Sequence, residues 1–154
     1  MINKIVQVSL ILALGLSFAA EPALAMGNFT PESAAVWVAR ANRLIEAGSG
    51  DNANNSEELI AGMKGACSGI TMEVSRPNIP DWAQRGQLYF CHSLDGVSNR
   101  FLQKAACDNM KEARGAFAKA NPAKDPEEVV AVAQRLHDLS DLLLEVYKAK
   151  KYCR

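Results

Sequence analysis

Residues 125–146 read DPEEVVAVAQRLHDLSDLLLEV and carry the clearest helix signal in the chain. An aspartate suited to capping, a proline suited to the first turn and two glutamates suited to the positive end of the helix dipole stand together at its start. Apolar residues then recur at steps of three or four, which places them on one helix face: Val129, Val132, Leu136, Leu139, Leu143 and Val146. The stretch predicts a long helix with one face toward a core.

Two further helix patterns lie near the N-terminal side of the chain. Thr30 and Pro31 form a start signal, and apolar residues at helical spacing follow until the turn-forming residues 48–52. A second pattern begins at Ser56 and ends before Pro77. Three glycines weaken its helix propensity and predict that a neighbouring segment approaches closely: Gly62, Gly65 and Gly69.

A third helix is predicted to begin near Trp82, with Asp81 as its cap. We expect a kink at Asp95-Gly96 and a break or bend near Cys107. Between these two points the apolar face is predicted to continue through Val97, Phe101, Leu102 and Ala105.

A shorter fourth helix is predicted over residues 110–120, and Asn121-Pro122 ends it. No alternating strand pattern of useful length occurs anywhere in the chain. We therefore predict an all-α fold, a small bundle of about five helices, in a single domain over residues 26–154.

Residues 1–25 have the pattern of a secretory signal peptide. Lys4 supplies a positive start, residues 5–20 are mostly apolar, and Ala23-Leu24-Ala25 has small residues where a signal peptidase needs them. The alternative is a membrane anchor, but an apolar run of about 16 residues is shorter than the ~20 that span a bilayer. We expect cleavage, and a periplasmic or secreted domain.

The charge balance excludes the simplest electrostatic functions. The chain has 17 basic and 17 acidic residues and a formal net charge of zero. The predicted leader contains Lys4 and Glu21, so its removal keeps the balance even. Nucleic-acid binders normally carry a basic surplus. We therefore expect no nucleic-acid partner. No second segment is long and apolar enough to cross a membrane, so we also expect no membrane partner once the leader is removed.

The four cysteines all follow the predicted leader: Cys67, Cys91, Cys107 and Cys153. An even number of cysteines in an exported domain predicts disulfides. No two of them form the Cys-x-x-Cys motif of redox sites, and their wide spacing is unlike that of a zinc site. The sequence therefore predicts two disulfides that staple the bundle, and no metal.

Helix geometry favours one pairing of these cysteines. Cys67 lies nine residues before Arg76 and Cys91 lies nine residues after Trp82, on either side of the proline turn. In an antiparallel hairpin both would lie about 14 Å from the turn, so we prefer Cys67–Cys91. Cys107–Cys153 follows only by elimination. Cys67–Cys107 with Cys91–Cys153 stays open as an alternative.

Catalytic residues are few. The candidate bases are His92 and His137. Three carboxylates share one helix face, and paired carboxylates can serve as general acid and base: Asp138, Asp141 and Glu145. We favour a boundary histidine and a solvated helix face, which explain these residues without catalytic chemistry. We expect no enzyme and no cofactor. The alternative is a haem between helices, ligated by His137 with a methionine: Met63, Met72 or Met110.

The order of these features resembles the Rap/Tai-type immunity proteins of bacterial type VI secretion. That family has a signal peptide and a small helical domain with four cysteines, the second followed by a glycine-containing helix start. The matching positions here are Cys67, Cys91 with Gly96, Cys107, Asn121-Pro122 and Cys153, and the helix after the third cysteine matches residues 110–122. The resemblance covers residues 56–153. The chain departs from the family pattern at His92-Ser93-Leu94.

The resemblance implies a periplasmic protein that inhibits a peptidoglycan-cleaving amidase by direct contact. Contacts are expected in the connectors, residues 48–55 and 77–85, with Trp82, Arg85 and Asn78 as partner-binding residues, because Trp and Arg are enriched at binding hot spots. Trp82 could instead only pack at a helix start. Other interpretations are a haem or small-ligand carrier and a structural subunit of an envelope complex, and a homodimer also stays open.

Overall fold

The computed structural model describes residues 27–49, 55–68, 70 and 78–153. These ranges contain helices and no strand, which confirms the all-α prediction: α1 (Pro31–Ser49), α2 (Ser56–Cys67), α3 (Asp81–Val97), α4 (Gln103–Phe117) and α5 (Glu127–Ala149). The predicted signal peptide lies outside the described residues. In the described part, no helix has the length and apolar character needed to cross a membrane.

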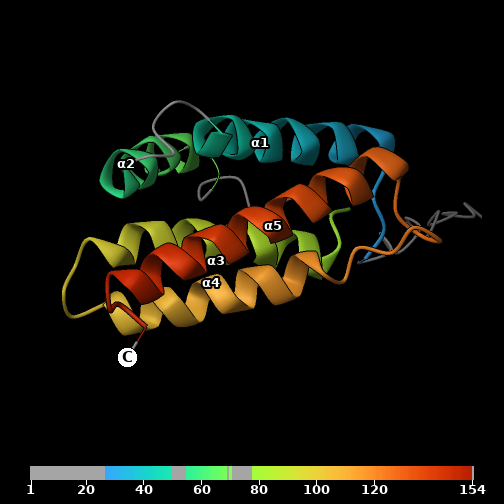
Figure 1. Cartoon of the computed structure of the whole chain (residues 1–154). Helices are drawn as coiled ribbons and strands as arrows, with labels where there is room; N and C mark the ends of the chain where they lie inside the picture. The colour runs from blue at the N-terminus through green and yellow to red at the C-terminus, as the bar shows by residue number, and fades with distance from the viewer. Residues whose placement is uncertain (1–26, 50–54, 69, 71–77, 154) are drawn as a thin grey trace, which may run out of the picture.

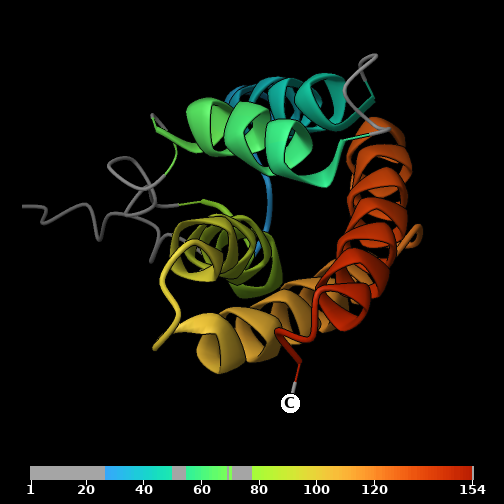
Figure 2. The same cartoon turned by 60° about the vertical axis from the view of Figure 1, so that its left-hand side comes forward.

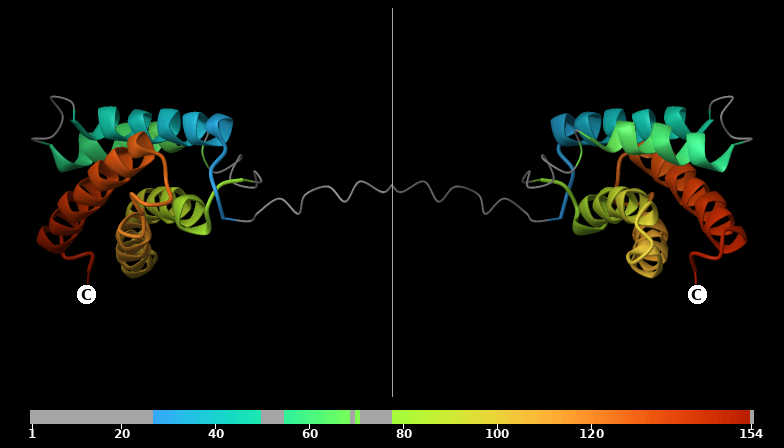
Figure 3. Two further views of the ribbon diagram at one scale, coloured as in Figure 1. Left: turned by 90° about the vertical axis from the view of Figure 1, so that its right-hand side faces the viewer. Right: turned by 90° about the vertical axis from the view of Figure 1, so that its left-hand side faces the viewer.

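The five helices pack as a closed ring around one core. Each helix contacts its neighbours in chain order, and α5 contacts α1. Figure 2 shows this ring nearly end-on. The hairpin of α3 and α4 lies on one side, α1 and α2 form a layer on the other, and α5 runs obliquely between the two (Figure 1 and Figure 3).

The predicted starts of α1 and α2 are confirmed. The Ser33 N–H donates to Thr30 Oγ1 at 3.1 Å, and the Thr30 N–H donates to Ser33 Oγ at 2.9 Å. This reciprocal pair acts as a capping box. At the start of α2, the Glu57 N–H donates to Asn55 Oδ1 at 3.1 Å, so Asn55 is the cap. Local polar chemistry therefore sets both boundaries.

The capping roles predicted for Asp81 and Asp125 are wrong. Pro80 and Pro126 hold the cap positions of α3 and α5, with ψ values of 144° and 142° that suit the extended backbone of a cap. Asp81 is the first residue of α3 instead. Asp125 Oδ2 accepts the Asn121 N–H at 2.7 Å and closes the connector that precedes α5.

The predicted break near Cys107 is also wrong. The chain turns at residues 98–102, and Cys107 lies inside α4. Asn99 causes this earlier turn, because its side-chain Oδ1 accepts the Phe101 N–H and its carbonyl accepts the Leu102 N–H. Phe101 and Leu102, predicted to lie on a buried face, are consequently 91% and 48% exposed.

The second helix is shorter than predicted. α2 ends at Cys67, and Ser68 caps it through an N–H bond to the Gly65 carbonyl. The close approach predicted at its glycines is wrong for Gly62 and Gly65, since a Cβ built on the first only just touches a neighbour at 4.0 Å and one built on the second meets nothing within 4 Å. Gly69 lies outside the described residues, as do residues 71–77 of the predicted helix.

Both preferred disulfides are present, and the alternative pairing is excluded. Cys67–Cys91 joins the end of α2 to the middle of α3, with Cα atoms 5.6 Å apart. The pairing is confirmed although α2 does not run up to the proline turn as the argument assumed. With Cys107–Cys153 also formed, the bonds include all four cysteines. Such bonds indicate an oxidising compartment.

Two features bring Cys153 to Cys107. The connector over residues 118–126 carries the chain past the end of α4 before α5 turns back, so the end of α5 lies beside the start of α4 (Figure 1). A Schellman turn then ends α5: Lys151 has φ 62°, the Lys151 N–H bonds the Lys148 carbonyl, and the Tyr152 N–H bonds the Tyr147 carbonyl.

Gly86 permits a close contact between α3 and α4. A Cβ built on Gly86 would overlap the ring of Phe117. We expect Gly86→Ala to lower the free energy of unfolding by about 1–3 kcal/mol, because overpacking outweighs the gain in helix propensity. Gly115→Ala is the control, since the space there is open and alanine should be neutral or stabilising. Urea unfolding of both variants measures the change in the free energy of unfolding. A stabilised Gly86→Ala variant would contradict the close packing of Phe117 against Gly86.

A buried hydrogen-bonded group joins α3, α4 and α5. Ser93 Oγ donates to the Ala106 carbonyl at 2.6 Å and lies 3.1 Å from the Tyr147 hydroxyl. Burial raises the pKa of Tyr147 to about 12, and the hydrogen bond with Ser93 opposes that rise. The folded state therefore favours the neutral phenol.

The raised pKa of Tyr147 predicts that the free energy of unfolding falls at alkaline pH. The stabilisation from the neutral Tyr147 phenol is complete below pH 10, the ordinary tyrosine pKa, and is lost as the pH rises toward 12. We expect the wild type to lose about 2–3 kcal/mol more than Tyr147→Phe across this range. Urea midpoints of both proteins from pH 9 to 12 measure the difference. Parallel curves would show that Tyr147 does not titrate as expected.

Candidate binding surfaces

Of the three predicted partner-binding residues, Asn78 is not among those that line a groove with the other two. Asn78 belongs to the joint before α3: its backbone has φ 69°, and its carbonyl accepts a hydrogen bond from Ser33 Oγ at 2.7 Å. This contact ties the joint to the start of α1. Asn78 therefore has a structural role, and its contact with a partner stays a prediction.

Trp82 is half-buried at the start of α3. Its ring packs edge-on against Trp37 and Phe29, with centroid distances of 5.6 and 6.1 Å. Trp37 is buried behind it and donates from Nε1 to the Ala83 carbonyl at 3.0 Å. The simpler interpretation of Trp82 is thus correct in part, because one side of the ring packs. The packing also holds the ring rigidly at the surface.

Trp82 and Arg85 do lie together, on a groove between α3 and α4 of about 230 Å³. The groove is lined by Trp82, Arg85, Tyr89, Lys111, Glu112, Gly115, Ala116 and Lys119. We call it the α3–α4 groove. Tyr89 was not among the predicted partner-binding residues, although its spacing of i+7 from Trp82 places it on the same helix face. The residues of α4 could not be predicted from the sequence, because their place in the groove depends on how two helices align.

The charges at this groove are exposed and locally paired. Arg85 Nε lies 3.2 Å from Asp81 Oδ1, and Lys111 Nζ lies 3.4 Å from Asp108 Oδ1. All four side chains are more than half exposed. Exposed pairs of this kind contribute little to stability, so both cations are available to exchange their carboxylates for those of a partner.

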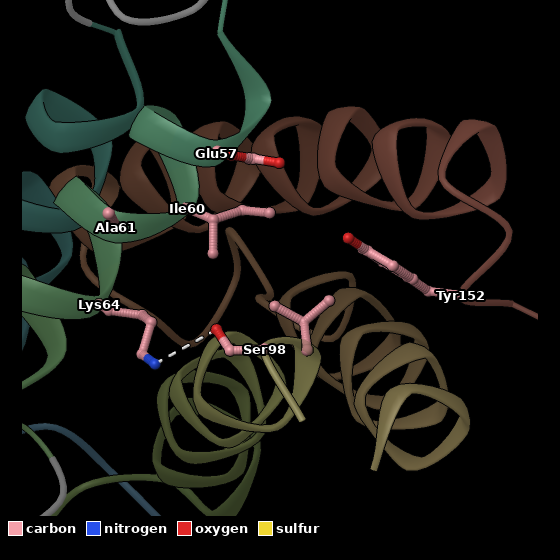
Figure 4. Close-up of a pocket in the computed structure, with 7 residues that line it drawn as sticks. Glu57, Ile60, Ala61, Lys64, Ser98 and Tyr152 are labelled. Atoms are coloured by element: carbon pink, nitrogen blue, oxygen red, sulfur yellow. Dashed lines mark hydrogen bonds between the residues drawn. The ribbon is translucent and has the colours of Figure 1, made fainter. Parts of the chain in front are cut away.

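A larger pocket, of about 360 Å³, opens between α2, the end of α3 and the C-terminal tail. Figure 4 shows Ile60 and Ala61 of α2 facing it, with Tyr152 across from them. Lys64 donates a long hydrogen bond of 3.5 Å to Ser98 Oγ at its edge. Its lining is partly apolar and partly charged, which suits an amphipathic ligand or side chain.

Of the two candidate histidines, His92 is exposed on α3, and His137 lies on α5 with the three carboxylates. His137 Nδ1 is 3.4 Å from Asp138 Oδ1 and 3.8 Å from Asp141 Oδ2. Asp141 also pairs with Arg114 of α4, and Glu145 pairs with Lys148. The Arg114–Asp141 pair joins α4 to α5, whereas the other contacts lie within α5. In the described part of the chain, no three such side chains are grouped to hold a metal ion.

Comparison with known proteins adds no relative: no protein-family model, no curated protein and no solved structure matches the chain.

Proposed function

We propose that this chain is an exported, periplasmic binding protein that inhibits a peptidoglycan-cleaving amidase by covering it, as the immunity proteins it resembles do. The observation that carries the proposal is the α3–α4 groove. It presents two aromatic side chains and an arginine on one helix face, Trp82, Tyr89 and Arg85. These are the residue types that dominate binding energy in protein interfaces.

The rigidity of the groove supports this use. Trp37 packs behind Trp82. Because Gly86 has no side chain, the Phe117 ring packs directly between α3 and α4 beneath the surface. A rigid surface loses little conformational entropy when a partner binds. The two disulfides support export to an oxidising compartment, where such an amidase would be met.

Filling the groove tests the proposal without disturbing the fold. A Cβ at Gly115 meets nothing within 4 Å, so Gly115→Leu should occupy the groove and keep α4 intact. Gly65→Leu is the matched control, because Gly65 is equally open on α2 and lies away from the groove. The probe is an exported amidase encoded beside this chain's gene, titrated by calorimetry. We expect tight binding of the wild type, at least a tenfold loss for Gly115→Leu, and no change for Gly65→Leu.

Either of two results would overturn the proposal: an amidase that does not bind the wild type, or equal binding of the two glycine variants. The pocket beside Tyr152 favours a second candidate, the small-ligand carrier. Native mass spectrometry of the purified protein separates the two, because a carrier retains a bound small molecule and the inhibitor has the mass of the oxidised chain alone.

A further inference from the structure

The connector between α3 and α4, residues 98–102, places large apolar side chains in water. Phe101 is 91% exposed and Leu102 is 48% exposed. Burying a phenylalanine side chain stabilises a fold by about 1.5–3 kcal/mol, and Phe101 does not contribute this stabilisation here. Figure 1 shows the connector projecting at one end of the molecule, beyond α3 and α4. The apolar pair thus forms a projecting tip.

Basic side chains surround the tip. Arg100, Lys104 and Lys151 line a hollow of about 160 Å³ together with Phe101, Gln103 and Tyr152, and none of the described residues that line it is acidic. The first two come from the connector and α4, whereas Lys151 is placed by the Schellman turn and the adjacent Cys107–Cys153 bond. In a chain of zero net charge, this is a local positive surface built from distant segments.

The occupant of such a surface must be negative and must accept an apolar side chain. A second copy of the chain fits poorly, because the same cations would face one another. A protein partner would need a pocket to receive the projecting ring. A lipid surface meets both requirements, since anionic headgroups lie above an apolar layer.

We propose that the tip contacts an anionic membrane surface, with Phe101 entering the headgroup boundary and Arg100, Lys104 and Lys151 beside the phosphates. This departs from the expectation of no membrane partner, which rested on the absence of a second membrane-spanning segment. The α3–α4 groove begins at the opposite end of α3, so the tip and the groove can be occupied together.

Vesicle sedimentation tests this proposal independently of any amidase. The oxidised exported chain is mixed with vesicles containing about 30% phosphatidylglycerol in phosphatidylcholine, and with phosphatidylcholine alone. We expect binding only to the anionic vesicles, and a several-fold loss when salt rises from about 50 to about 500 mM. Phe101→Ser should reduce the bound fraction several-fold with unchanged stability, because the side chain is already in water.

The control is Leu142→Ser, which removes a leucine that is 47% exposed on α5 and is not among the residues that line the basic hollow. We expect it to bind like the wild type. Absence of binding to anionic vesicles at low salt overturns the proposal, as does equal binding of Phe101→Ser. A Phe101→Ser variant that keeps its vesicle binding but loses amidase affinity would assign the tip to the protein interface instead.

Discussion

Replacing Cys107 and Cys153 together by alanine is expected to lower the free energy of unfolding by about 4 kcal/mol. The bond closes a loop with a sequence separation of 46, and loop closure of that length removes about this much free energy from the unfolded chain. The total stability of such domains is about 5–15 kcal/mol, so the variant should be close to unfolding at 37 °C. Guanidinium unfolding at 25 °C provides the measurement.

The Cys67→Ala/Cys91→Ala pair is the matched control for this prediction. Its loop is shorter, with a separation of 24, so the expected loss is slightly smaller, about 3.5 kcal/mol. The two double variants should also differ locally, because only loss of Cys107–Cys153 frees Tyr152 from the pocket it lines. A loss below about 1 kcal/mol for either pair would show that the bonds do not stabilise the fold through chain entropy.

Trp37→Ala is expected to cost about 3–5 kcal/mol, the largest effect of any single substitution discussed. Trp37 is 1% exposed, donates to the Ala83 carbonyl and packs against two aromatic rings. Its loss leaves a cavity between α1 and α3. Urea unfolding measures the cost, and loss of near-ultraviolet circular dichroism should accompany it.

Trp37→Phe separates packing from hydrogen bonding in this cluster. It keeps most of the apolar contact and removes the Nε1 donor, so we expect a loss of about 1–2 kcal/mol. Trp37→Ala should also weaken partner binding, because Trp82 loses the ring that supports it. Equal stability of Trp37→Ala and Trp37→Phe would contradict the packing described for this residue.

The parts of the fold that depend on local chemistry could be predicted from the sequence. Thr30 and Pro31 start α1 because side-chain oxygens and a fixed φ act on their nearest neighbours. The face of α5 followed from the spacing of its leucines and valines. Export and an even count predicted two disulfides, whereas the preferred pairing came from a hairpin argument that placed the end of α2 wrongly.

Two sources of error are local turn chemistry that overrides helical spacing and contacts between residues far apart in the sequence. Phe101 follows Val97 by four residues, which is the spacing of a buried helix face, yet Asn99 turns the chain between them. The close contact of Gly86 depends on Phe117, which belongs to another helix. In the candidate site, Trp82 and Arg85 were predicted from one helix, whereas Lys111 and Gly115 depend on the alignment of α3 with α4. Periodicity along one helix contains no information about that alignment.

The most direct test of the proposed function is to look for an exported amidase encoded beside this chain's gene and to measure its activity on purified peptidoglycan with increasing amounts of this protein in its oxidised form. Inhibition by direct contact predicts that activity falls in proportion to added protein and is abolished near one equivalent per amidase. The Gly115→Leu variant should need at least ten times as much. Full amidase activity in the presence of a large excess of the wild-type protein would contradict the proposal.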